Sequence, residues 1–198
     1  MSPLGHYITA LGLGLSGAAT IGGEYYWEHG HLRILTDTVR WIGDSFAVGQ
    51  SHRTPYAAIG FFFAFGAIFG ARAPDLLERP FLAFVRMVRV IGYRALAHTP
   101  WFWTVLSLPV AWLALQPAAN DPAMLVFLWV AIGFLAAAWL HLAVDFFSVG
   151  GIPWLKPRGT TIGVSVYENG SVSELLLIVP LLAMQFAVPY FIQHPYQF

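Results

Sequence analysis

Side chains that suit metal-dependent chemistry occur as two spaced pairs in this 198-residue chain. His141 and Asp145 are four residues apart, so on a helix both project from one face about one turn apart. Asp75 and Glu78 are three residues apart and would present two carboxylates in the same way. Imidazole nitrogen and carboxylate oxygen are ligands that suit Zn²⁺ or Mn²⁺. The spacing therefore makes a divalent metal site the first hypothesis.

The composition says what kind of protein must position these residues. Hydrophobic residues make up 58% of the chain and charged residues only 10%, whereas a soluble domain carries about 25% charge. The formal net charge is zero, which argues against nucleic acid as a partner. The absence of cysteine excludes thiolate metal sites and a cysteine nucleophile. These numbers predict an all-α protein of the membrane.

Five apolar stretches are long enough to predict about five transmembrane helices. We expect them to form a single integral membrane domain over residues 1–198. The first is rich in glycine and the second is short, so the second would cross the bilayer nearly upright. The stretches are Leu4–Gly22, Tyr56–Gly70, Trp101–Leu115, Met124–Phe147 and Leu175–Ile192.

Cationic residues between these stretches predict the orientation by the positive-inside rule. Residues 73–99 and 148–173 become cytoplasmic loops, and the N-terminus lies in the cytoplasm. Residues 23–55 become an extracytoplasmic loop with an amphipathic helix that lies on the membrane surface. This Gly23–Pro55 loop also offers a docking surface for a protein partner. The cations that decide the orientation are Arg72, Arg79, Arg86, Arg89, Arg94, Lys156 and Arg158.

In this topology the ionisable residues share the cytoplasmic ends of their helices, where each costs about 2.5–3.5 kcal/mol if it enters the membrane. His6 begins the first stretch, His98 precedes the third and Glu174 opens the fifth. Together with the two pairs, they are enough for one or more hydrolytic metals, which lower the pKa of a bound water to about 7. A lone histidine at a helix end is commonly an interfacial anchor, so the hypothesis depends on this convergence.

Two carboxylates have simpler alternative roles. Glu78 is close enough in sequence to pair with Arg79 or with Arg94. Ser171 and Glu174 have the Ser-x-x-Glu spacing of a helix capping box. Both alternatives stay open at the level of the sequence.

Several segments resemble one family. They are Met-Ser-Pro-Leu-Gly-His6, Ala-Pro-Asp75-Leu-Leu-Glu, Tyr-Arg94-Ala-Leu-Ala-His98-Thr and His141-Leu-Ala-Val-Asp145-Phe-Phe-Ser-Val-Gly-Gly-Ile-Pro-Trp-Leu-Lys-Pro. In this order they resemble the YdjM-like family of LexA-regulated inner-membrane proteins, regarded as metal-dependent hydrolases. That family is considered distantly similar to zinc-dependent phospholipase C and the P1-type nucleases. The resemblance places the chain in the bacterial inner membrane. It covers nearly the whole chain, and the block that starts at His141 is the most specific.

The resemblance implies a metal centre and roles for its residues. The implied ligands are His6, Asp75, His98, His141 and Asp145, and the metal is Zn²⁺, with Mn²⁺ as the alternative. Glu78 or Glu174 would act as base or orient a ligand, and Arg94 would stabilise developing phosphate charge. The chain departs from the family pattern at Tyr93, where the family usually has histidine, and at Pro100, where it has serine.

These features favour a membrane-bound metal-dependent hydrolase that acts on phosphoesters, with phospholipid headgroups of the surrounding membrane as substrates. The alternative is a structural membrane subunit of a larger complex, in which the polar cluster or a structural metal locks helices together. The Tyr93 departure and the long Gly23–Pro55 loop support that alternative. An ion-coupled transporter is disfavoured, because its ionisable residues would lie at mid-membrane.

Overall fold

The computed structural model describes residues 2–21, 56–77, 96–116, 121–154 and 160–193. The long helices in these ranges are an N-terminal helix (residues 3–21), α2 (Tyr56–Gly70), α4 (Pro100–Ala114), α5 (Pro122–Phe146) and α6 (Val172–Gln193). Shorter elements are a helix over residues 73–77, the 3₁₀ helix η1 (Leu96–His98), and strands β1 (Ile152–Pro153) and β2 (Thr161–Ile162).

The predicted all-α class is confirmed, and each apolar stretch forms a helix whose ends lie within about three residues of those expected from the sequence. Proline sets two of the starts, because α4 begins at Pro100 and α5 at Pro122, where a missing N–H costs the helix nothing. Asp121 caps α5 by accepting hydrogen bonds from the N–H groups of Ala123 and Met124.

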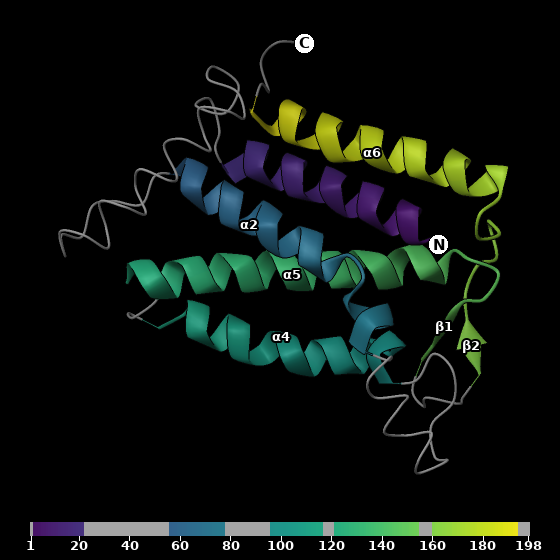
Figure 1. Ribbon diagram of the computed structural model, residues 1–198, viewed down its shortest axis with the longest axis horizontal. Coiled ribbons are helices and arrows are strands. Elements are labelled where there is room, and N and C mark those ends of the chain that lie inside the picture. Colours follow the sequence, from purple (N-terminus) through teal and green to yellow (C-terminus); the bar gives the residue numbers. More distant parts are fainter. Residues whose placement is uncertain (1, 22–55, 78–95, 117–120, 155–159, 194–198) are drawn as a thin grey trace.

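The long helices lie side by side in the order α6, N-terminal helix, α2, α5 and α4 (Figure 1). Glycine allows α2 and α5 to touch backbone to backbone. A Cβ on Gly133 would lie 2.0 Å from the carbonyl oxygen of Phe63, and one on Gly66 would lie 2.0 Å from that of Val130. Close approach through small residues is a common way to pack helices in membranes. It fixes α2 against α5 along much of their length.

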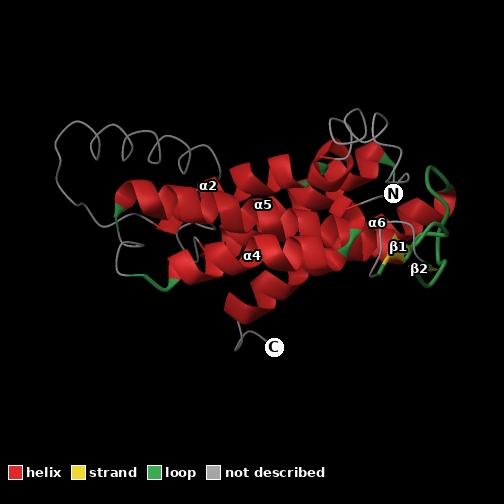
Figure 2. Cartoon of the chain, turned by 90° about the horizontal axis from the view of Figure 1, so that it is seen from below, coloured by secondary structure: helices red, strands yellow, loops and turns green. Residues whose placement is uncertain are grey.

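A small hairpin closes one end of the bundle. Residues 148–173, predicted as a loop, contain the antiparallel pair β1–β2, in which Ile152 pairs with Ile162 and Pro153 with Thr161. Figure 2 shows this hairpin at the end of the bundle where the N-terminal helix starts. The described part of the second predicted loop, residues 73–99, contains the helix 73–77 and η1. The predicted amphipathic loop, residues 23–55, lies outside the described residues.

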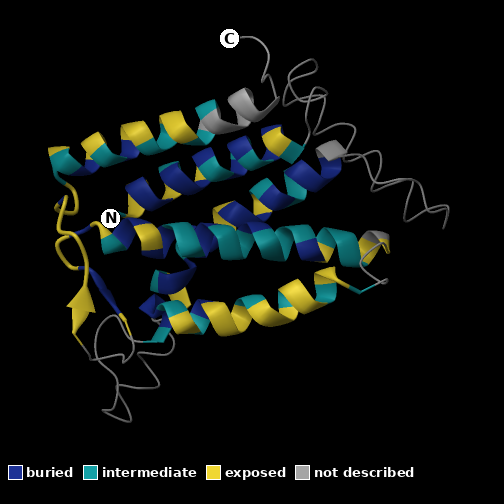
Figure 3. Cartoon of the chain, turned by 180° about the vertical axis from the view of Figure 1, so that it is seen from behind, coloured by how far each residue is buried: buried dark blue, intermediate teal, exposed yellow. Residues whose placement is uncertain are grey.

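Exposure differs between the inner and outer helices (Figure 3). Large apolar side chains on α4 and α6 face outward, among them Val105, Leu108, Leu176 and Val179.

One described helix segment, Ala123–Phe146, is long and apolar enough to cross a membrane, and most of it is not buried within the protein. The other apolar segments that the structure describes are shorter, such as Pro100–Ala114. The count of five crossings and the side that each loop faces stay predictions.

Candidate metal centre

Four side chains bring donor atoms close together in pairs at the hairpin end of the bundle. The Nε2 of His98 lies 3.5 Å from Asp75 Oδ1 and 3.8 Å from Asp145 Oδ2. The Nε2 of His141 lies 3.9 Å from Asp75 Oδ1 and 3.6 Å from Asp145 Oδ2. Each imidazole thus faces both carboxylates. The predicted convergence of these four residues is present in the structure.

Each of these four separations is close to the distance between two ligands of one metal ion. Ligands at about 2.1 Å from Zn²⁺ in a tetrahedron lie about 3.4 Å from one another. The four pairs measured here, at 3.5–3.9 Å, are slightly wider than this and longer than good hydrogen bonds. Two overlapping groups of three can also be drawn, one of His6, Asp75 and His141 and one of His98, His141 and Asp145. The donors therefore fit a divalent cation.

His141 is held in the tautomer that a metal ligand needs. Its Nδ1 lies 2.8 Å from the carbonyl oxygen of Ala71, which can only accept a hydrogen bond, so Nδ1 carries the proton. Nε2 then keeps its lone pair, is buried and has no hydrogen-bond partner among the described residues. Histidine ligands commonly donate their second N–H to a backbone carbonyl in this way. A buried acceptor left open toward two carboxylates is the observation that best fits a bound cation.

The carbonyl of Ala71 is available because α2 ends just before it. The last carbonyls of a helix have no partner within the helix. The chain turns at residues 71–72 and enters the helix 73–77, with Pro74 in its first turn. The end of α2 thereby orients His141 of α5 and also delivers Asp75 to the same place.

His6 adds a third imidazole to the cluster. Its ring stacks on that of His141, with centroids 3.6 Å apart and planes 4° apart. The Nε2 of His6 lies 3.6 Å from Asp145 Oδ1, the second oxygen of that carboxylate. The Nδ1 of His6 is buried without a hydrogen-bond partner among the described residues. His6 thus joins the cluster from the N-terminal helix.

The turn that carries His98 is held by its neighbours. The indole N–H of the fully buried Trp103 donates to the carbonyl of Ala97 at 2.6 Å, and the hydroxyl of Thr99 donates to Leu96 O at 2.6 Å. Thr99 stands at the N-cap position of α4, followed by Pro100. η1 therefore cannot shift without breaking contacts of a core tryptophan.

The end of α5 that carries Asp145 is closed by the chain that follows it. The hydroxyl of Ser148 donates to Asp145 O at 2.7 Å, and the Tyr167 hydroxyl donates to Val144 O at 3.1 Å. The N–H of Val164 donates to Phe146 O at 2.9 Å. These donors satisfy carbonyls that a helix end leaves open. The last turn of α5, with Asp145 in it, is therefore fixed by the segment after β2.

Asp75 is the open side of the cluster, since its side chain is 34% exposed while the other four side chains are 1–3% exposed. Burial raises the pKa of Asp75, but the imidazoles of His98 and His141 beside it lower the pKa by more, to about 2. Asp75 is therefore ionised at neutral pH. Among the five described side chains of the cluster, Asp75 is the one that solvent reaches.

Arg72 stands beside this opening. Its Nε lies 4.0 Å from Asp75 Oδ2, and its guanidinium lies 5.7 Å from the centre of the Tyr7 ring. The buried Nε has no hydrogen-bond partner among the described residues. At the sequence level Arg72 counted only toward the orientation of the chain. The Arg72-x-x-Asp75 spacing was the signal that could have placed this cation at the site.

The three residues predicted to assist the metal ligands have different outcomes. Glu78 and Arg94 lie outside the described residues, so their predicted roles stay predictions. Glu174 is buried at the start of α6, where it accepts hydrogen bonds from Ser2 and Gly170. The predicted capping box with Ser171 is not seen among the described contacts, because Glu174 accepts from the N–H of Gly170, which precedes α6, and the Ser171 hydroxyl donates to Glu168 O.

The model of the YdjM inner membrane protein family matches residues 1–195. The chain belongs to this family. Its membership confirms the resemblance and the predicted inner membrane location. No curated protein and no solved structure matches the chain. The similarity of the YdjM family to phospholipase C and P1-type nucleases stays a prediction.

Proposed function

We propose that this protein is a membrane-bound metal-dependent hydrolase of phosphoesters. The observation that carries the proposal is the buried Nε2 of His141, held as a lone-pair donor and facing Asp75 and Asp145 at 3.9 and 3.6 Å. His98 completes a set of four donors, and His6 approaches from the side of Asp145. Nitrogen and oxygen donors in this number suit Zn²⁺ or, alternatively, Mn²⁺.

The protein residues have separate tasks in this hydrolysis. A divalent metal held by the four donors supplies Lewis acidity, which polarises a phosphoryl oxygen and acidifies water. Ala71 keeps the His141 ring in orientation through its carbonyl. Arg72 lies beside the half-buried Asp75, so we assign it the same task that was predicted for Arg94. A guanidinium there would bind a phosphate oxygen and stabilise its charge.

Phospholipid headgroups are the proposed substrates, because the family is one of inner membrane proteins and the cluster lies at one end of the bundle. We propose five crossings, with the N-terminus and this end of the bundle on the cytoplasmic side. Headgroups would then reach Asp75 from the inner leaflet. Reporter fusions at residues 78–95 and 23–55 test the topology: the first range should report the cytoplasm and the second the outside.

The test of the function measures metal and turnover on the same purified samples. Elemental analysis should find Zn²⁺ or Mn²⁺ in the full chain. Phosphate or phosphorylated headgroup should be released from phospholipid vesicles, and release should stop after chelation and return with metal. His141→Ala should lose both metal and turnover while its helical circular dichroism is retained. Arg72→Gln should keep the metal and raise KM or lower kcat.

Two results would count against the proposal. A folded wild-type chain that binds no divalent metal would remove its chemical basis. A chain that binds metal, releases nothing from any phosphoester and purifies with a stoichiometric partner would favour the alternative of a structural subunit. In that case His141→Ala should lower the affinity for the partner, and there would be no reaction rate for it to change.

A further inference from the structure

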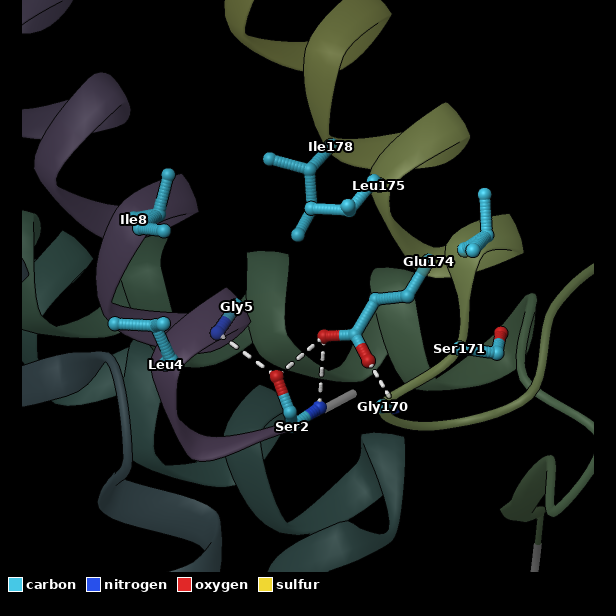
Figure 4. A pocket seen from close by; sticks show the side chains of 10 residues that line it. Ser2, Leu4, Gly5, Ile8, Gly170, Ser171, Glu174, Leu175 and Ile178 are labelled. Carbon is cyan, nitrogen blue, oxygen red and sulfur yellow. Dashed lines mark hydrogen bonds between the residues drawn. The ribbon is translucent and has the colours of Figure 1, made fainter.

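Glu174 is a buried carboxylate that lies apart from the metal ligands and joins the starts of two helices (Figure 4). Its Oε1 accepts hydrogen bonds from the N–H of Ser2 at 2.9 Å and from the hydroxyl of Ser2 at 2.6 Å. Its Oε2 accepts one from the N–H of Gly170, just before α6. Helix N-termini carry partial positive charge, so two of them stabilise one carboxylate here.

Ser2 links Glu174 to the N-terminal helix, which carries His6. The hydroxyl oxygen of Ser2 accepts a hydrogen bond from the N–H of Gly5 at 3.2 Å, as a helix N-cap does. The carbonyl of Ser2 accepts one from the N–H of His6 at 3.1 Å. Two successive hydrogen bonds through Ser2 therefore connect the Glu174 carboxylate with the backbone of His6.

Other contacts show that His6 needs such an anchor. His6 lies in the first turns of its helix, where the chain is least constrained by its own hydrogen bonds. Its ring must nevertheless stack on His141 at 3.6 Å and place Nε2 at 3.6 Å from Asp145. The crevice beside Ser2, between the N-terminal helix and α6, is lined mainly by apolar side chains such as Leu4, Ile8 and Leu175. They provide contact area but no polar bond that fixes the rotation of the helix.

We propose that Glu174 is a positioning residue of the metal centre, which acts through Ser2 to fix the first turn of the N-terminal helix and with it the imidazole of His6. This inference rests on the proposed function in one respect, namely that the cluster binds a metal. The anchoring of His6 itself is a claim about the protein without its metal, and it can be tested separately.

The first experiment is a Co²⁺ titration of the full-length protein in detergent, followed by its visible absorption. Glu174→Ala should weaken Co²⁺ binding about ten-fold, as expected when a residue that orients a ligand is removed, and should change the spectrum. Ser2→Ala removes only the hydroxyl, so it should change Co²⁺ affinity and the spectrum in the same direction as Glu174→Ala but to a smaller extent. Glu168→Ala is the matched control, because Glu168 is an exposed carboxylate of the same segment, and it should change neither.

A double-mutant cycle then asks whether Glu174 acts through His6. His6→Ala with Glu174→Ala should bind Co²⁺ as weakly as His6→Ala alone. If Glu174→Ala costs the same factor in both backgrounds, its effect does not pass through His6 and the inference is wrong. An unchanged affinity and spectrum in the single Glu174→Ala variant would also overturn it.

The second experiment needs no metal and separates this inference from the proposed function. His6 is 3% exposed, so diethylpyrocarbonate should modify it slowly in the metal-free wild type and in Glu168→Ala. Modification of His6, mapped by mass spectrometry, should become several-fold faster in Glu174→Ala. Equal rates would contradict the anchoring role. A wild type that binds no Co²⁺ but shows the faster modification in Glu174→Ala would refute the metal function and retain the anchor.

Discussion

Asp145 and Glu174 are two carboxylates at the hairpin end of the bundle, and each is only 2% exposed. Their surroundings differ. Glu174 receives its donors at hydrogen-bonding distance, 2.9 Å from the N–H and 2.6 Å from the hydroxyl of Ser2. Asp145 faces three imidazole nitrogens, of His6, His98 and His141, at 3.6–3.8 Å.

The difference shows how the two carboxylates are stabilised. A buried carboxylate requires hydrogen bonds, a cation or both. Donors at 2.6–2.9 Å already satisfy Oε1 of Glu174, so this oxygen needs no cation. The wider spacing around Asp145, next to a histidine whose Nδ1 proton is already engaged by Ala71, leaves room for one. The exposed fraction is therefore the same for both carboxylates, and the distance to the donors separates the proposed anchor from the proposed metal site.

The largest expected effect on metal affinity comes from replacing each carboxylate by the neutral amide of the same shape. Asp145→Asn should lower metal affinity by more than about 100-fold, because it removes a charged ligand that faces three imidazoles. Glu174→Gln should lower it by about ten-fold or less, since one amide oxygen still accepts from Ser2. Metal content after gel filtration measures both. Equal losses in the two variants would mean that the carboxylates do not have separate roles, and Glu168→Gln should match wild type.

Acid should release the metal by protonating the histidines and not by protonating Asp75. Metal affinity should fall as pH is lowered, because protons compete for the histidine nitrogens. Asp75, with its pKa lowered to about 2, stays ionised while the histidines become protonated. Its own stabilising effect is present above its ordinary pKa of 3.8 and is lost only as pH falls toward 2. Co²⁺ retention between about pH 8 and pH 4 measures this, and a flat profile would exclude histidine ligands.

A smaller effect should follow from separating α2 and α5. A Cβ on Gly133 would meet the backbone oxygen of Phe63, so Gly133→Ala should destabilise the protein by about 1–3 kcal/mol. It should also weaken metal binding by moving Ala71 and Asp75 away from His141, while His6 stays protected from diethylpyrocarbonate. Thermal unfolding in detergent and Co²⁺ titration measure the two effects.

Gly12→Ala is the matched control for that variant. Its Cβ would meet the ends of the Gln185 and Leu182 side chains, which can move aside. It should therefore cost less stability than Gly133→Ala and leave Co²⁺ affinity unchanged. A greater loss of metal in Gly12→Ala than in Gly133→Ala would mean that the N-terminal helix, and not the α2–α5 contact, sets the geometry of the site.

The helices and the meeting of the ligands could be predicted from the sequence for simple reasons. Uninterrupted apolar runs indicate helices by length alone, and prolines at 100 and 122 mark two of their starts. The i, i+4 spacing of His141 and Asp145 fixes their common face before any tertiary contact exists. His6 lies near the start of the N-terminal helix, Asp75 follows the end of α2 and His98 precedes the start of α4. An up-and-down bundle therefore brings all three to one end.

What the sequence did not predict depends on contacts between distant residues. The bond from His141 to Ala71 joins residues 70 positions apart, and that from Ser2 to Glu174 joins residues 172 apart. No local pattern encodes either one. Arg72 looked like one of several loop cations until the fold placed it beside Asp75. Strands β1 and β2 have two residues each, too few for an alternating pattern to stand out.

The ligands also have an order along the chain that matters for biosynthesis. His6 is made first and Asp145 last, so most of the protein must be translated before the cluster exists. A nascent chain that stalls before α5 holds at most three of the five ligands and neither of the two on α5. A metal ion held by all five proposed ligands would therefore bind only after α5 has been made.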